Sequence, residues 1–127
     1  SPDVRLAMFK PVDISISLRL RPNANVIHVR EIAELWVRAF LDPYEGGIDR
    51  EGWSFGGTLY AQDFARMVSD IPEVRHVSSV RLYGDLDDGD RPQPGWERDQ
   101  GEEELQLVDE DLFQVKRIRI EIEDELW

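Results

Sequence analysis

Few side chains in this sequence are suited to acid–base, nucleophilic or metal chemistry. The only histidines are His28 and His76, far apart in the chain, and there are no cysteines. The absence of cysteine excludes thiolate nucleophiles, thiolate metal sites and disulfides. The only lysines are Lys10 and Lys116, and no nucleophile elbow or His-x-x-x-His pair is present. We therefore expect no catalytic residues, no cofactor, no metal site and no enzyme activity.

An acidic run invites a calcium hypothesis, which its spacing does not support. The run surrounds Gly89 and consists of Asp85, Asp87, Asp88 and Asp90. A helix–loop–helix calcium site needs a twelve-residue pattern that ends in a bidentate glutamate, and this run lacks it. The Asp, Gly and Pro content instead predicts a flexible acidic loop.

The glycines between Gly52 and Gly57 resemble a phosphate-binding loop only superficially. No lysine follows them, the glycine spacing is wrong, and no predicted strand precedes them. Glycine permits tight chain reversal, so this stretch predicts a turn-rich connector. Trp53 and Phe55 are two residues apart and point the same way in extended backbone. They are either buried rings that pin the loop or exposed anchors for a partner.

The charge is unevenly distributed along the chain. Of a net charge of −12, residues 1–84 carry 10 basic and 11 acidic side chains, and residues 85–127 carry 5 and 16. An acidic tail argues against binding a nucleic-acid backbone, which requires clustered cations. The tail is either a solvated segment or a docking arm for a basic partner. No run of about 18 apolar residues is present, so we expect no membrane span.

Hydrophobic periodicity predicts the first two elements. Residues 12–20 alternate between apolar and polar side chains, the pattern of a half-buried strand. Residues 26–41 place apolar side chains at helical spacing, with Asn25 as a plausible N-cap. Pro43 disfavours helical geometry at Asp42, so this helix should end there.

Four further elements follow. A second helix is predicted to open at Gly57 or Thr58 and to end at Pro72. Residues 74–83 predict a strand with a bulge at Ser78-Ser79, where the alternation changes phase. Residues 84–101 predict a loop with Trp96 as its one large apolar side chain. Residues 105–108 predict a short strand, and residues 115–122 predict a third long strand.

These elements predict the fold class. The order β-α-α-β-β favours an α+β two-layer sandwich, with two helices on one face of a mainly antiparallel, three- to four-stranded sheet. We expect a single domain over 1–127, with a βααβ core at 12–83, an acidic flexible loop at 84–104 and C-terminal strands with an acidic end at 105–127. The chain does not begin with methionine, so we expect it to be a fragment of a longer protein.

An ordered series of short motifs resembles a known family. The series is Asp42-Pro43, Gly46-Gly47, Gly52-Trp53-Ser54-Phe55-Gly56, Leu59-Tyr60 and Ile71-Pro72-Glu73-Val74, followed by Val77 and Val80. It resembles the C-terminal domain of baseplate J-like proteins, wedge subunits of contractile phage tails and related injection systems. The resemblance covers about residues 12–83. The sequence departs from the family pattern at Ser54, Gly57 and Glu73.

The resemblance implies a structural role. It implies an assembly module that docks other baseplate wedge proteins and further copies of itself, in the bacterial cytoplasm during assembly and then in the baseplate of the virion or phage-tail-like particle. The candidate interaction loop consists of Pro43, Gly46, Gly47, Gly52, Trp53, Phe55, Gly56 and Tyr60. We expect Trp53 and Phe55 to set the shape of this loop. The alternative is a regulatory α+β domain that binds a small ligand between sheet and helices.

Overall fold

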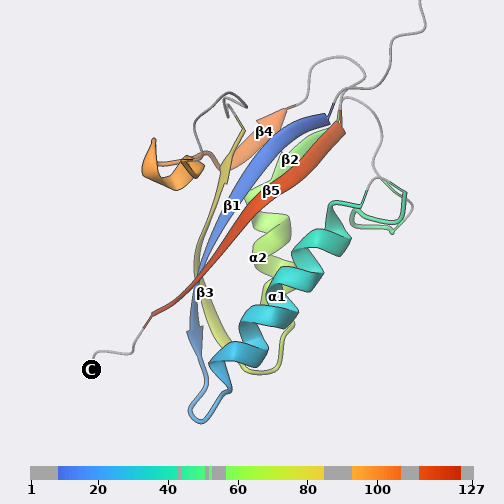
Figure 1. Ribbon diagram of the computed structural model, residues 1–127. Helices are drawn as coiled ribbons and strands as arrows, with labels where there is room; N and C mark the ends of the chain where they lie inside the picture. Colours follow the sequence, from blue (N-terminus) through green and yellow to red (C-terminus); the bar gives the residue numbers. More distant parts are fainter. Residues whose placement is uncertain are drawn as a thin grey trace, which may run out of the picture.

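The described part of the chain has an α+β fold with two α-helices, one short 3-10 helix and two sheets. A computed structural model describes residues 9–42, 44–50, 52, 57–84, 93–106 and 112–123 (Figure 1). A mixed three-stranded sheet has the order β3-β1-β5, and a two-stranded sheet pairs β2 with β4. In chain order the elements are β1 (Phe9–Leu20), α1 (Val26–Phe40), β2 (Thr58–Tyr60), α2 (Ala61–Ser69), β3 (Val74–Tyr83), the 3-10 helix η1 (Gly95–Glu97), β4 (Glu104–Gln106) and β5 (Leu112–Ile122). None of the helices in the described ranges is long and apolar enough to cross a membrane.

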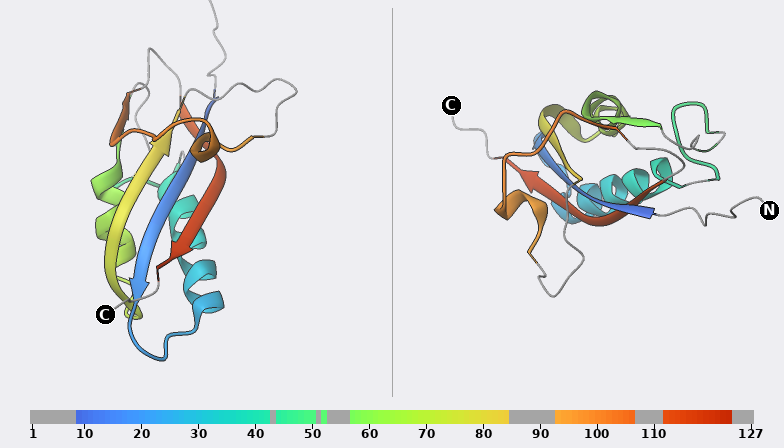
Figure 2. Two further views of the ribbon diagram at one scale, coloured as in Figure 1. Left: turned by 90° about the vertical axis from the view of Figure 1, so that its left-hand side faces the viewer. Right: turned by 90° about the horizontal axis from the view of Figure 1, so that it is seen from above.

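The hydrophobic core lies between the three-stranded sheet and the two helices. Both helices cover the same face of this sheet, and η1 lies over the other face (Figure 2). The central strand β1 forms the middle of the sheet side of the core, because four of its alternating side chains are fully buried. The main core residues are Val12, Ile14, Ile16 and Leu18 from β1, Val29, Ala33 and Val37 from α1, and Phe64 and Val68 from α2.

Helix α1 agrees with its prediction. Its N-cap is Asn25, whose side-chain oxygen accepts a hydrogen bond from the backbone N–H of His28 at 3.1 Å. Such a cap satisfies one of the backbone donors left free in the first turn. The helix ends at Phe40 with Leu41 as C-cap, as expected from the proline two residues further on.

Helix α2 begins later than predicted. Residues 58–60 form strand β2, which pairs antiparallel with β4, and the helix starts at Ala61. The backbone N–H of Ala61 donates to the carbonyl of Glu103 at 2.8 Å, so the tertiary contact with the 102–104 segment holds the preceding residues extended. The predicted apolar stripe remains, since Phe64, Val68 and Ile71 are buried.

Strand β3 has the predicted bulge. Ser79 pairs with Ser17 on β1, but the next pair joins Val77 to Leu18, so Ser78 is an extra residue on β3. The bulge restores the phase of the alternation. Val77, before the bulge, therefore packs against the same core as Val80 and Leu82, after it.

The prediction of a mainly antiparallel sheet is wrong for one of its two strand pairs, and the two-layer sandwich is not confirmed. Strand β5 pairs with β1 in parallel, from Phe9 opposite Leu112 to Leu18 opposite Ile122. The cause is the route of the chain. Strand β3 ends beside the start of β1, at the pair Tyr83–Asp13, and β5 begins at that same end of the sheet but on the far side of β1. It must therefore run in the direction of β1. The expected order β-α-α-β-β also omitted the short strand β2.

Several predicted features lie wholly or partly outside the described residues. The acidic run at Asp85, Asp87, Asp88 and Asp90 is among them, as are residues 124–127 of the acidic end. Within the segment predicted as a flexible loop, the described part contains η1 and the start of β4.

Candidate interaction surfaces

The glycine loop closes the C-terminal end of α1. The N–H of Gly47 donates to the carbonyl of Phe40 at 2.8 Å, and the N–H of Gly46 donates to the carbonyl of Asp42 at 2.9 Å. A further bond joins the N–H of Gly52 to the carbonyl of Gly46 at 2.9 Å. The last carbonyls of a helix lack intrahelical partners, and the loop supplies a hydrogen-bond donor for one of them, the carbonyl of Phe40. The bond between Gly52 and Gly46 folds the loop back on itself.

The side chain of Asp42 orders the first turn of the loop. Its Oδ1 accepts hydrogen bonds from the backbone N–H groups of Tyr44, at 2.8 Å, and Glu45, at 3.0 Å. An aspartate that bonds the backbone two and three residues further on replaces a backbone turn. The loop therefore leaves the helix in a defined direction.

Gly46 is required by a close approach of backbone atoms. A Cβ built at this position would lie 2.2 Å from the carbonyl oxygen of Phe40 and 2.5 Å from that of Asp42. Contacts this short do not occur between real atoms, so no other residue fits without movement of the helix end. The next residue, Gly47, has φ +86°, a conformation that favours glycine.

Two large apolar side chains project from this ordered loop into solvent. Tyr44 is 84% exposed and Ile48 is 77% exposed. Single exposed apolar residues are common on protein surfaces. Here, however, both belong to a short segment whose backbone is hydrogen-bonded to α1 and to itself, so the points at which they leave the backbone are held.

The structure brings together only part of the predicted interaction loop. Gly46, Gly47 and Gly52 are adjacent in one hydrogen-bonded turn. Tyr60 is separate from them, at the end of β2, where it serves as N-cap residue of α2 and is 41% exposed. The remaining members, Pro43, Trp53, Phe55 and Gly56, lie outside the described residues, so the role of the two rings in shaping the loop stays a prediction.

A buried polar cluster covers the sheet face opposite the helices, and the sequence did not predict it. Asp13 and Ser15 alternate with the core residues of β1, and in the predicted half-buried strand they would be exposed. They are only 0% and 4% exposed. Segment 93–101, which contains η1, lies over this face of the sheet (Figure 2). The N–H of Gly95 donates to Asp13 Oδ2 at 2.8 Å.

Gly95 must be glycine for this cover to fit. A Cβ at Gly95 would lie 2.4 Å from the Cβ of Tyr83, which neighbours Asp13 on the adjacent strand. The ring of Trp96 packs edge-on against Tyr83 at 6.3 Å between centroids. Burial raises the pKa of Tyr83, although Arg119 opposes the shift. The one sequence signal for this cover was the lone Trp96 in an otherwise polar loop.

Arg119 of β5 joins the cover to the sheet. Its Nε donates to Ser15 Oγ at 2.8 Å, and its guanidinium lies 4.9 Å from the centre of the Trp96 ring. An arginine in this position bonds through its edge and stacks through its face. The cluster therefore holds segment 93–101 by a carboxylate, an arginine and two aromatic rings.

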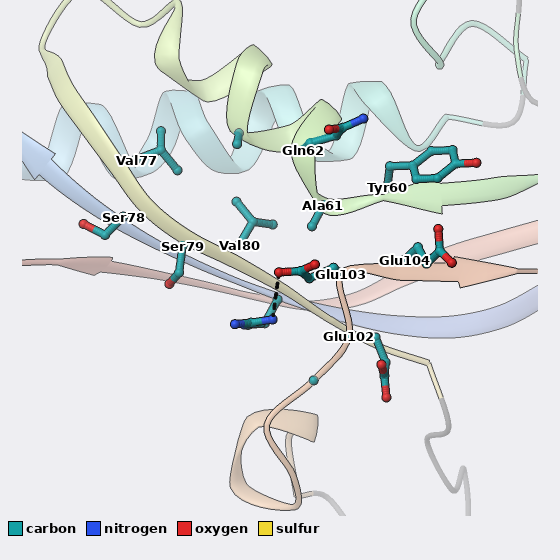
Figure 3. A pocket seen from close by; sticks show the side chains of 13 residues that line it. Tyr60, Ala61, Gln62, Val77, Ser78, Ser79, Val80, Glu102, Glu103 and Glu104 are labelled. Atoms are coloured by element: carbon teal, nitrogen blue, oxygen red, sulfur yellow. Dashed lines mark ion pairs between the residues drawn. The ribbon is translucent and has the colours of Figure 1, made fainter.

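A groove runs along the outer edge of β3 (Figure 3). It has a volume of about 920 Å³ and is lined by β3 from Val77 to Arg81, by the first turns of α2 with Tyr60, and by residues 101–104. A second hollow, of about 640 Å³, lies between α1, the glycine loop and α2. Its lining includes Trp36, Phe40, Met67 and Arg50.

The described ranges contain no group of three or more histidine, aspartate or glutamate side chains placed to hold a metal ion. His28 lies beside Glu73, with 3.7 Å between Nε2 and Oε2. No protein-family model matches the chain, and the search of curated proteins finds no relative.

Gly46→Ala should lower the stability of the fold. Because the added methyl group would meet two backbone carbonyls, we expect a loss of about 1–3 kcal/mol in the free energy of unfolding, as for other overpacked sites. Urea denaturation measures it. The matched control is Ile48→Ala in the same loop, which should change the value by less than about 0.5 kcal/mol. Equal stabilities of the two variants would contradict the close approach of the loop to α1.

Asp13→Ala should release the cover over the polar sheet face. The variant loses a charge-assisted bond to the Gly95 N–H and leaves a void, so we expect a loss of about 1–3 kcal/mol. In NMR spectra the amide signal of Gly95 should move strongly. Ser17→Ala changes the same face of β1 four residues further on and serves as control. An unchanged Gly95 amide in the Asp13 variant would show that this bond does not hold the cover.

Proposed function

We propose that this chain is a structural assembly module in the baseplate of a contractile phage tail or related injection system. In this role it docks neighbouring wedge subunits through protein–protein contacts. The first support is the motif series from Asp42 to Val80, which resembles the C-terminal domain of baseplate J-like proteins. The second support is the geometry of the segment that carries the first of these motifs.

The observation that carries the proposal is the presentation of Tyr44 and Ile48. Both are exposed by more than three quarters of their surface, on a loop whose backbone is bonded to the end of α1. Tyrosine and large aliphatic side chains anchor protein interfaces when they enter a pocket on the partner. A pre-ordered loop also loses less conformational entropy on binding than a mobile one.

The proposed partners are other baseplate wedge proteins and further copies of this chain, and no nucleic acid. The proposed location is the bacterial cytoplasm during assembly and the baseplate of the finished particle afterwards. The proposed role is structural and not enzymatic, because docking uses the outer surface of the fold and requires no reaction step.

Particle incorporation tests the proposal. In cells that produce the protein, the wild-type chain should sediment with assembled tail or injection-system particles. A Tyr44→Ala/Ile48→Ala variant should be incorporated at least about tenfold less, because two interface anchors are each worth more than about 1 kcal/mol. The purified variant should retain its melting temperature, since both side chains are exposed.

The control for this experiment is Leu35→Ala, which removes a side chain that is 65% exposed on α1. It should be incorporated like the wild type. If the wild-type chain is absent from every such particle, the proposed function is wrong. If the double variant is incorporated normally, the loop is not the docking element.

A small-ligand regulatory domain is the second candidate, and the hollow beside the glycine loop favours it. Trp36, Phe40 and Met67 give this hollow an apolar part, and Arg50 adds a cationic group. Pockets of this composition bind small molecules. One carboxylate oxygen of Asp42, which also lines it, already accepts two backbone hydrogen bonds. A dose-dependent rise in melting temperature with amino acids or nucleotides would favour this candidate over the assembly module.

A further inference from the structure

The outer edge of β3 carries backbone groups that point away from the sheet. Leu82 uses both its N–H and its C=O to bond Glu102, at 2.9 and 2.8 Å, so these groups face away from β1. In an antiparallel pair, residues on one strand alternate between facing the partner strand and facing outward. Val80, two residues from Leu82 and opposite Ile16, therefore also directs its N–H and C=O outward. These groups face the groove, which Val80 lines.

The edge is only partly covered within the described residues. The Glu102 segment makes a single bridge to β3, at Leu82, and then turns to β2, where Glu104 pairs with Tyr60. Apart from that bridge, no further strand of the described residues pairs with the outer edge of β3. In Figure 3, Val80 lies between Ala61, at the start of α2, and Glu103, and Ser79 and Ser78 continue the lining of the groove along β3.

The charges along this groove are mainly negative. Three consecutive glutamates, Glu102, Glu103 and Glu104, lie on one side, and all are exposed. The cation that lines the groove, Arg81, is already within 3.6 Å of Glu103. The excess of carboxylates over cations favours a positively charged occupant.

We propose that the groove binds an extended, lysine- or arginine-bearing segment of a partner protein as an additional strand on β3. The segment bonds the backbone of Val80 in line with the Glu102 bridge, and its basic side chains face the glutamates. An exposed sheet edge is a template for such strand addition, in which the backbone supplies affinity and the side chains supply selectivity. This inference rests on the proposed docking function and names the partner chemistry for one surface.

A second copy of this chain paired edge to edge at β3 is a poor occupant of the groove. Such a symmetric pair would bring the two glutamate rows of the copies together, and like charges placed side by side oppose association. The bulge at Ser78 also limits the length of regular edge that two copies would share. A basic segment meets the same bulge, but it places cations and not carboxylates beside the glutamates.

Peptide titration followed by NMR tests the inference on the whole chain. The probe is a short capped peptide of alternating lysine and valine. It should bind at low salt and move the amide signals of Ser79, Val80 and Arg81 more than those of α1. The same peptide with alternate backbone nitrogens methylated keeps its charge but cannot form the ladder, and it should bind at least tenfold more weakly. A glutamate–valine peptide should not bind.

Protein variants give the matching test. Glu102→Lys/Glu104→Lys should weaken binding of the lysine peptide at least tenfold, whereas Glu31→Lys, a charge reversal on the exposed face of α1, should change it less than twofold. Equal binding of the methylated peptide, signal changes away from β3, or self-association of the chain through this edge would overturn the inference. If the lysine peptide does not bind the wild-type chain while that chain is incorporated into particles normally, the groove is wrong and the assembly function stands. If the peptide binds as expected but the wild-type chain is absent from particles, the assembly function is wrong and the groove stands.

Discussion

The fold depends on a central strand, β1, that is paired on both edges and covered on both faces. It bonds β3 in antiparallel and β5 in parallel register. One face carries four fully buried aliphatic side chains, each of which contributes about 1.5–3 kcal/mol when removed from water. The other face carries Asp13 and Ser15, which are also buried. Burying a polar group without a hydrogen bond is costly, so the two faces need different covers: two apolar helix stripes on one side and the polar cluster under segment 93–101 on the other. That cluster satisfies Asp13 Oδ2 through the Gly95 N–H, whereas Asp13 Oδ1 has no partner among the described residues.

This arrangement determines which surfaces remain for binding. The helices and segment 93–101 occupy the faces of the sheet, and β5 occupies one edge of β1. The outer edge of β3 is bridged at Leu82 and faces the groove at Val80. The glycine loop completes the end of α1 through its backbone, which leaves its side chains, such as Tyr44, directed outward. Both candidate surfaces therefore follow from how the core is closed.

Periodicity in the sequence predicted the elements that face one core on one side. Strand β1, helix α1 and the bulged strand β3 are of this kind, and their bounds agree with the structure to within a few residues. The direction of β5 was not predictable, because alternation is the same in parallel and antiparallel strands. Strand β2 was missed because three residues around Leu59 also fit the first turn of a helix. The burial of Asp13 depends on contact with Gly95, which is 82 residues away in the sequence. A local sequence pattern cannot predict such a contact. In the glycine loop, the turn was predictable from residue type, but the close approach at Gly46 was not.

Amide hydrogen exchange of the free protein tests most directly whether β1 is paired on both edges while β3 has an open one. The amides from Ile14 to Ser17 should exchange slowly, because they donate hydrogen bonds alternately to β3 and to β5. These bonds break only when the core unfolds. The amide of Val80, on the outer edge of β3, should exchange orders of magnitude faster, although its side chain is buried. Slow exchange at Val80 in dilute solution, or fast exchange along β1, would contradict this account.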